Sequence, residues 1–140
     1  MLIRIPQWTS GVDIRLNGEP LDDVSAEPGT YAKITRDWVD GDTITIRLPM
    51  SLYTVPANDR PDLAAIAYGP VILSGIYGDE NLTTSPTIAL DTVQKSEGGT
   101  FLDFQATADN ETVKLGPFYN AQGFNYNVYW VLSGALPERK

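Results

Sequence analysis

The sequence predicts an all-β protein, an antiparallel β-sandwich of jelly-roll type with about eight to ten strands and no substantial helix. Apolar and polar residues alternate in several short runs, which is the period of a strand with one buried face. The 12 glycines and 10 prolines are spread through the chain, so turns are expected at short intervals. No long segment carries an apolar stripe of helical period, so no helix is expected to cover the sheets.

In the first half of the chain, alternation predicts strands over residues 3–5, 12–16 and 43–48. Each run places its apolar residues on one face and its charged or hydroxyl side chains on the other. Turns are expected at residues 17–18, an Asn-Gly pair that tolerates the positive φ angles of a tight turn, and at residues 40–42.

The second half is predicted to hold a central strand within residues 63–73, a nearly continuous apolar run that suits burial on both faces. Pro70 cannot donate a hydrogen bond to a sheet, so we expect it at a bulge or a strand end. Residues 75–100 are rich in small and polar residues and are expected to form the longest connection. Alternation predicts a further strand over residues 102–106.

The closing run, residues 126–132, is predicted to be a strand that buries Trp130. Alternation places Trp130 on one face with Tyr126, and Tyr129 on the opposite face. Only one of the two tyrosines is therefore expected to reach the core with Trp130.

The whole chain, residues 1–140, is expected to form a single β-sandwich module. An internal boundary near residues 56–62 is the alternative, with a first β segment over 1–58 and a second over 62–136. The sequence leaves open whether two such segments would form one sandwich or two.

Composition excludes several classes of function. The net charge of −8 repels phosphate backbones and anionic lipids, so neither nucleic acid nor a membrane surface is an expected partner. No run approaches the roughly 20 apolar residues that a membrane helix needs. The chain has no cysteine and no histidine, which removes thiolate zinc sites, cysteine nucleophiles and Ser-His-Asp triads.

The carboxylates and the aromatic residues remain as candidates for a site. Most of the Asp residues fall in predicted turns, so no catalytic, cofactor-binding or metal-binding residue is assigned. Aromatic rings near loops and strand ends can stack on sugars, although core packing is their commoner role. The residues expected to contact a sugar or another domain are Trp8, Trp38, Phe118, Tyr119, Asn125 and Tyr126.

Several short motifs occur in a specific order along the chain. They are Arg4-Ile5-Pro6-Gln7-Trp8, Asn17-Gly18, Tyr31 with Arg36-Asp37-Trp38, Gly41-Asp42 before Leu48-Pro49-Met50, Gly69-Pro70, and Pro117-Phe118-Tyr119 before Tyr126-Asn127-Val128-Tyr129-Trp130. In this order they resemble the β-rich C-terminal part of the bacterial β-L-arabinofuranosidase family, glycoside hydrolase family 127, and its uncharacterised relatives. The likeness covers residues 2–77 and 112–132.

The resemblance implies that the chemistry lies elsewhere in a parent glycoside hydrolase. Enzymes of this family resemble one another in a Glu acid/base and a zinc-bound Cys nucleophile, both on a helical barrel upstream of the β-rich part. A chain without Cys cannot carry that site, so no catalytic residue is transferred and the metal site is expected outside this segment. Where the family often carries His and Arg in its final loop, this chain has Gln122, Gly123 and Asn125.

The leading hypothesis is therefore a non-catalytic accessory domain that packs on the helical barrel and shapes the sugar cleft. The alternatives are a stand-alone module that binds arabinose-containing glycans, and a structural or protein-binding sandwich without sugar contact. Its compartment would be that of the parent, either the bacterial cytoplasm or outside the cell. Because strand residues follow Met1 at once, we expect an excised or truncated piece of a longer protein.

Overall fold

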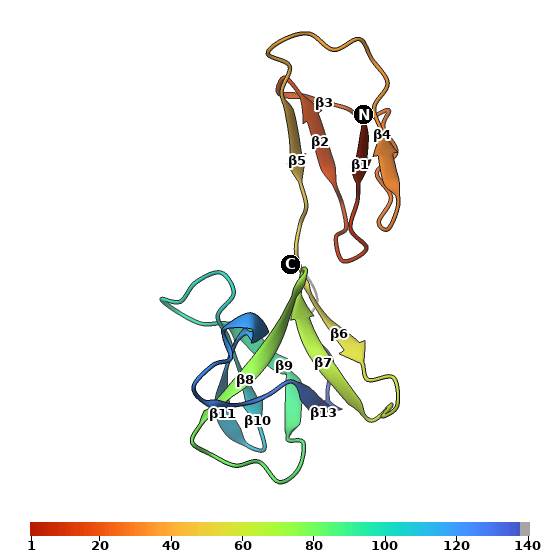
Figure 1. Cartoon of the computed structure of the whole chain (residues 1–140). Helices are drawn as coiled ribbons and strands as arrows, with labels where there is room; N and C mark the ends of the chain where they lie inside the picture. The colour runs from red at the N-terminus through yellow and green to blue at the C-terminus, as the bar shows by residue number, and fades with distance from the viewer. Residues whose placement is uncertain (138–140) are drawn as a thin grey trace. The chain divides into compact units, whose positions relative to one another are not determined.

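The computed structural model describes residues 1–137 as an almost purely β structure, with thirteen strands and one short 3-10 turn, η1 (Phe118–Asn120) (Figure 1). The chain divides into two compact units, Met1–Ser51 and Leu52–Lys140. The near absence of helix agrees with the sequence prediction.

The first unit contains two small antiparallel sheets. One pairs β1 (Leu2–Arg4) with β4 (Tyr31–Lys33), and the other has the order β3 (Glu19–Pro20), β2 (Asp13–Leu16), β5 (Ile44–Arg47). A single core lies between them, formed by Ile5, Ile14, Ala32 and Ile34. The register pairs Ile14 of β2 with Ile46 of β5. Ile14 is buried but Ile46 remains at the surface, so this pair contributes only Ile14 to the core.

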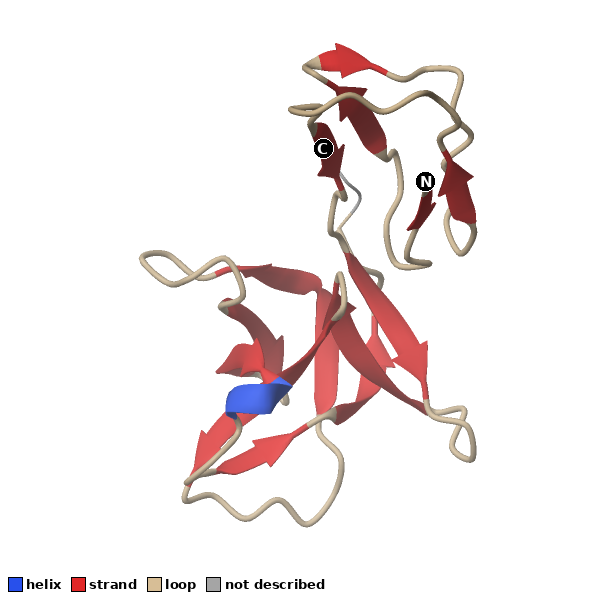
Figure 2. Ribbon diagram, turned by 45° about the horizontal axis from the view of Figure 1, so that its top comes forward, coloured by secondary structure: helices blue, strands red, loops and turns tan. Residues whose placement is uncertain are grey.

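The second unit is a closed barrel. Its ring has the order β8 (Val71–Gly78), β11 (Glu111–Pro117), β10 (Phe104–Ala108), β9 (Thr87–Lys95), β13 (Tyr129–Ser133), β7 (Leu63–Tyr68). It closes because β7 also pairs with β8, and all its pairs are antiparallel except β13 with β9 (Figure 2). Two further strands attach to the ring, β6 (Leu52–Pro56) on β7 and β12 (Asn125–Asn127) on β8.

Trp130 is the largest side chain in the barrel core and is fully buried. Its ring lies over Gly75 of β8, where an added Cβ would be 2.4 Å from Trp130 Cη2 and 2.7 Å from Cζ2. The ring of Tyr77 packs beside it at a centroid distance of 6.3 Å. Within the described residues, the Trp130 indole N–H has no hydrogen-bond partner. Glycine at position 75 is therefore what allows the indole to fill the core.

A bulge in β9 interrupts the pairing with β10. Gln94 pairs with Gln105, but the next registered pair is Ala89 with Thr107, so β9 contributes extra residues. The hydroxyl of Thr92, in the bulge, donates to the Ala89 carbonyl at 2.6 Å and accepts the Thr107 N–H at 2.8 Å. The side chain of Thr92 thus replaces a backbone partner that the bulge removes.

The closed barrel corrects the predicted jelly-roll sandwich. Alternation reports which face of a strand is buried, but both a sandwich and a barrel bury one face of each strand, so it cannot report closure. The predicted number of strands was also too low. Residues 75–100, predicted as the longest connection, are partly strand, because β8 continues to Gly78 and β9 occupies Thr87–Lys95. Residues 63–73 form the hairpin of β7 and β8, with Pro70 in its turn and β7 buried along its middle.

The closing run differs from its prediction as well. Trp130 is buried as expected, but Tyr126 and Tyr129 are both exposed. The strand breaks at Val128, so that β12 pairs with β8 while β13 pairs with β7 and β9. The break resets the alternation, and Tyr126 therefore does not share the core face of Trp130.

Residues 56–62, where the sequence suggested an internal boundary, form the end of β6 and its connection to β7. The division into compact units falls earlier, between Ser51 and Leu52. Among residues 1–137 there is no helix of the length and apolar character needed to cross a membrane.

Candidate functional site

An apolar hollow on the second unit is the candidate site. Its volume is about 650 Å³, within the range of pockets that bind small molecules or anchor side chains of a partner. We name it the aromatic hollow, and its lining consists of Val55, Leu63, Ala65, Ile72, Ser85, Phe118, Tyr126, Asn127, Val128 and Tyr129.

The strands present these residues on the outside of the barrel. On β8, Leu73 and Gly75 face the core, so Ile72, just before Leu73, and Ile76, just after Gly75, face outward. Tyr129 is paired with Ala65 of β7, and its neighbour Trp130 fills the core, so Tyr129 also faces outward. The hollow is thus lined from the outer faces of β6, β7 and β8 and from the segment that crosses them near Val128.

Three large rings make this surface unusual. Phe118, Tyr126 and Tyr129 are 44%, 45% and 48% exposed, although aromatic side chains normally bury most of their area. Phe118 and Tyr126 contact each other, with ring centroids 5.5 Å apart and planes inclined by 59°. No charged side chain is among the described lining residues. An exposed apolar patch of this kind is typical of an interaction surface.

Two other predicted site residues lie close to the hollow without lining it. Tyr119 follows Phe118 in η1 and is 62% exposed. Asn125 begins β12, and its side-chain amide donates to the Glu80 carbonyl at 2.9 Å and to Asn81 Oδ1 at 3.2 Å. Asn125 therefore ties β12 to the connection after β8, which is a structural role.

The remaining two predicted residues, Trp8 and Trp38, belong to the first unit. Trp38 is 41% exposed, and the guanidinium of Arg36 lies 5.4 Å from the centre of its ring. Trp8 is half-buried. The structure thus brings Phe118 and Tyr126 into one hollow and leaves the two tryptophans in a separate unit.

Three of the sequence motifs meet in one hydrogen-bonded cluster in the first unit. The Asp42 carboxylate accepts the Asn17 side-chain amide at 2.8 Å and the Val39 N–H at 2.9 Å, and it pairs with Arg36 at 3.2 Å. Asn17 Oδ1 in turn accepts the Thr43 N–H at 2.8 Å. The motifs around Asn17, Arg36 and Asp42 therefore fasten two turns to each other.

These bonds decide what the Asp42 carboxylate can do. The hydrogen bonds from Asn17 and Val39, with the charge of Arg36, hold the pKa of Asp42 below its ordinary value of 3.8. A general acid at neutral pH needs the opposite shift, a raised pKa that keeps its proton. Asp42 is thus suited to holding a turn and is unsuited to donating a proton.

Tyr77 and the acidic side chains complete the acid-base groups of interest. Burial, with a smaller contribution from Asp109, raises the pKa of Tyr77 to about 12, far from a value useful at neutral pH. No group of three or more acidic side chains among residues 1–137 is close enough to hold a metal ion.

Sequence reasoning did not propose Val55 and Tyr129 for the site. Tyr129 carried a usable signal, because it is next to Trp130 in a strand and must face away from a core that contains Trp130. Val55 carried no signal in the sequence, because it reaches the hollow only through the pairing of β6 with β7.

Comparison with known proteins gives a family match for the first unit. Residues 1–50 match the family described as "Beta-L-arabinofuranosidase, GH127 middle domain". The match ends where the first unit ends. Because the matching family is a middle domain, the expected C-terminal position is not confirmed for this part of the chain. No curated protein sequence matches the chain.

Solved structures resemble the chain over nearly its whole length. A GH127 beta-L-arabinofuranosidase from Geobacillus stearothermophilus T6 has a TM-score of 0.73 at 19% identity, and covers 94% of this chain and 26% of its own. A protein described as a glycoside hydrolase has a TM-score of 0.69 at 20% identity, over 94% of this chain and 27% of its own. The GH127 beta-arabinofuranosidase BT3674 has a TM-score of 0.59 at 17% identity, over 93% and 24%.

The chain thus spans about a quarter of the length of these structures. At such identities the likeness concerns the fold. The first unit matches the middle domain of GH127 β-L-arabinofuranosidases by sequence, and the chain as a whole has the fold of a β-rich part of solved glycoside hydrolases, two of them GH127 enzymes.

Proposed function

We propose that this chain is a non-catalytic accessory region of a GH127-like β-L-arabinofuranosidase. The observation that carries the proposal is the match of residues 1–50 to the GH127 middle domain, in a chain that covers only about a quarter of comparable enzymes. The first unit would serve as the middle domain, and the barrel would follow it as a second supporting domain.

The residues available to the chain favour an accessory role. It has no cysteine or histidine, so it supplies neither a thiolate nucleophile nor an imidazole acid or base. Hydrolysis by a pair of carboxylates needs one of them to keep its proton near neutral pH. The pKa of Asp42, which its neighbours Asn17, Val39 and Arg36 lower, is shifted in the wrong direction for that task.

The aromatic hollow provides the contact with the rest of the enzyme. Tyr and Phe are enriched at the buried centres of interfaces, where a ring fills a pocket and its polar tip finds a partner. Phe118, Tyr126 and Tyr129 present such rings on one outer face of the barrel. We take their partner to be the catalytic part of the same enzyme, because the comparable structures are about four times as long as this chain.

Two experiments test the proposal. The 140-residue chain, incubated with p-nitrophenyl β-L-arabinofuranoside, should release no nitrophenol above the buffer rate. In the longer enzyme, the pair Tyr126→Ser and Tyr129→Ser should lower both melting temperature and activity, whereas Tyr31→Ser, at a tyrosine that is 58% exposed in the first unit, should not. Turnover by the isolated chain, or a natural protein that contains no catalytic part, would refute the accessory role.

A stand-alone carbohydrate-binding module is the second candidate. The exposed rings of Phe118 and Tyr126 favour it, because the apolar face of a sugar can stack on an aromatic ring. Titration of the isotopically labelled chain with arabinose-containing oligosaccharides separates the two. Saturable shifts of the signals from these rings favour the module, and constant signals at millimolar sugar exclude it.

A further inference from the structure

A second surface feature of the barrel is a row of four outward-facing side chains on β9, β10, β11 and β8. Register pairs Gln94 of β9 with Gln105 of β10, Gln105 with Lys114 of β11, and Lys114 with Ile76 of β8. Paired residues lie on the same face of a sheet, so the four side chains follow one another from strand to strand. We name this row the polar strip. Its next neighbour is Tyr126, which pairs with Ile76 and lines the aromatic hollow.

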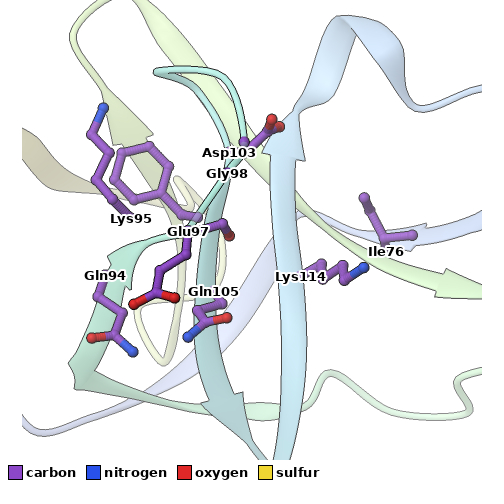
Figure 3. Close-up of a pocket in the computed structure, with 11 residues that line it drawn as sticks. Ile76, Gln94, Lys95, Glu97, Gly98, Asp103, Gln105 and Lys114 are labelled. Carbon is purple, nitrogen blue, oxygen red and sulfur yellow. The ribbon is translucent and has the colours of Figure 1, made fainter.

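The polar strip lies in a groove. All four of its residues line a depression of about 480 Å³, together with the loop that follows β9 (Figure 3). Figure 3 shows the side chains of Gln94 and Gln105 on one side of this groove with Glu97 near them, and Lys114 extending toward Ile76. A second groove of about 320 Å³ continues from Gln94 and Gln105 and is lined by threonines and Asp91.

The polar ends of the strip are available to a ligand. Within the described residues, the amides of Gln94 and Gln105 and the amine of Lys114 form no hydrogen bond or ion pair inside the chain. Lys95, which also lines the groove, is engaged instead: its amine lies 4.4 Å from the ring centre of Tyr68 and donates to the Phe101 carbonyl. Of the two described lysines that line the groove, Lys114 is therefore the one whose amine has no partner.

The chemistry of the strip selects a class of ligand. A glutamine amide both donates and accepts hydrogen bonds, which suits hydroxyl groups because each of these also does both. Glu97 and Asp103 balance the charges of Lys95 and Lys114 in the lining of the groove, which suits a neutral ligand, and the net charge of −8 on the chain disfavours an anionic one. Ile76, 39% exposed, adds an apolar contact, and Tyr126, 45% exposed, adds a ring at one end.

The length of the row points to an extended ligand. Within the groove, from Gln94 to Ile76, the row crosses three strand spacings, about 14 Å along the curved surface of the barrel at roughly 4.8 Å for each spacing. We propose that the polar strip binds a neutral, linear oligosaccharide that lies across the strands of the barrel, with its chain directed toward the aromatic hollow. This site goes beyond the accessory role, because none of the four residues of the polar strip lines the hollow.

The test uses the labelled 140-residue chain and three neutral probes, arabinotetraose, xylotetraose and cellotetraose. We expect at least one of them to shift the side-chain amide signals of Gln94 and Gln105 and the methyl signals of Ile76 in a saturable way. The matching monosaccharide should bind more weakly, and tetragalacturonate should bind more weakly than the neutral tetrasaccharides, because the net charge of the chain repels its carboxylates.

Variants decide whether the strip itself is responsible. The pair Gln94→Ala and Gln105→Ala should weaken binding about tenfold, because it removes two hydrogen-bonding side chains. Gln122→Ala removes an exposed glutamine outside the groove and should leave binding unchanged. Three results would overturn the inference: no shift with any neutral tetrasaccharide, shifts confined to Phe118 and Tyr129, or unaltered binding by the double variant. None of these bears on the hydrolysis assay of the accessory role.

Discussion

Replacing Gly75 by alanine tests the packing at the centre of the barrel. An ideal Cβ at this position lies 2.4 Å from Trp130 Cη2, 2.7 Å from Trp130 Cζ2 and 3.1 Å from Tyr77 Cε2. Trp130 is fully buried, so its ring has no free space into which it can move. The substitution must therefore displace the indole or the β8 backbone.

The size of the effect follows from two opposing contributions. Forcing an extra methyl group into a packed core typically costs about 1–3 kcal/mol. Alanine also restricts the unfolded chain, which returns about 0.4–1 kcal/mol. With the central values of both ranges, we expect a net loss of about 1.3 kcal/mol in the free energy of unfolding. For a unit of this size, that corresponds to a fall of roughly 5–10 °C in melting temperature.

Gly116→Ala is the matched control. Gly116 lies on β11, which pairs with β8, and a Cβ there would meet only Ile76 Cδ1 at 3.7 Å, an ordinary contact. This variant should be as stable as the original chain or slightly more stable. Urea unfolding is followed by tryptophan fluorescence in a Trp8→Phe, Trp38→Phe background, where Trp130 is the single reporter.

A double-mutant cycle then identifies the cause. Phenylalanine at position 130 lacks the outer ring atoms that the new methyl group would meet. In a Trp130→Phe background, followed by circular dichroism, Gly75→Ala should therefore cost less than half of what it costs beside the indole. An equal cost in both backgrounds, or a Gly75→Ala variant as stable as Gly116→Ala, would refute the packing argument.

Three further predictions concern single side chains. Thr92→Val should lower the free energy of unfolding by about 1–3 kcal/mol in urea, because the Thr107 N–H loses its partner, while exposed Thr112→Val should not. The pKa of Asp42 is lowered on folding, so its contribution to stability is complete above pH 3.8 and is lost as the pH falls through the pKa of the folded state. The Asp42→Asn variant should lack this acid dependence when melting is followed by fluorescence. Burial raises the pKa of Tyr77 from 10 to about 12, so its contribution is complete below pH 10 and lost as the pH rises toward 12; unchanged alkaline melting in Tyr77→Phe would contradict this.

The strands themselves were largely predictable from local patterns. Residues 43–48 alternate strictly and contain all of β5, and residues 12–16 contain all of β2, because period-two alternation is a property of the chain alone. Trp130 was predicted in the core and is there. What alternation could not supply was the closure of the barrel, which depends on β13 meeting β7 on one side and β9 on the other.

The candidate site was less accessible to prediction than the fold. Phe118 and Tyr126 lie eight positions apart on different elements, and their contact depends on how η1 and β12 lie against β8. The polar strip had no sequence signal, since Gln94 and Ile76 are neighbours only through the strands between them. The motifs around Asn17 and Asp42 were visible in the sequence, but the hydrogen bonds by which they fasten two turns together are apparent only in the folded structure.

The placement of β13 has a consequence for synthesis on the ribosome. This strand is near the end of the described chain, yet it joins β7 and β9, which are made much earlier. Until β13 emerges, both strands present unpaired backbone groups that can pair with other chains. The first unit, whose partners all lie within Met1–Ser51, can complete its core while the barrel is still open. Ribosome pausing or truncation ahead of residue 129 would therefore leave a folded first unit attached to an aggregation-prone second one.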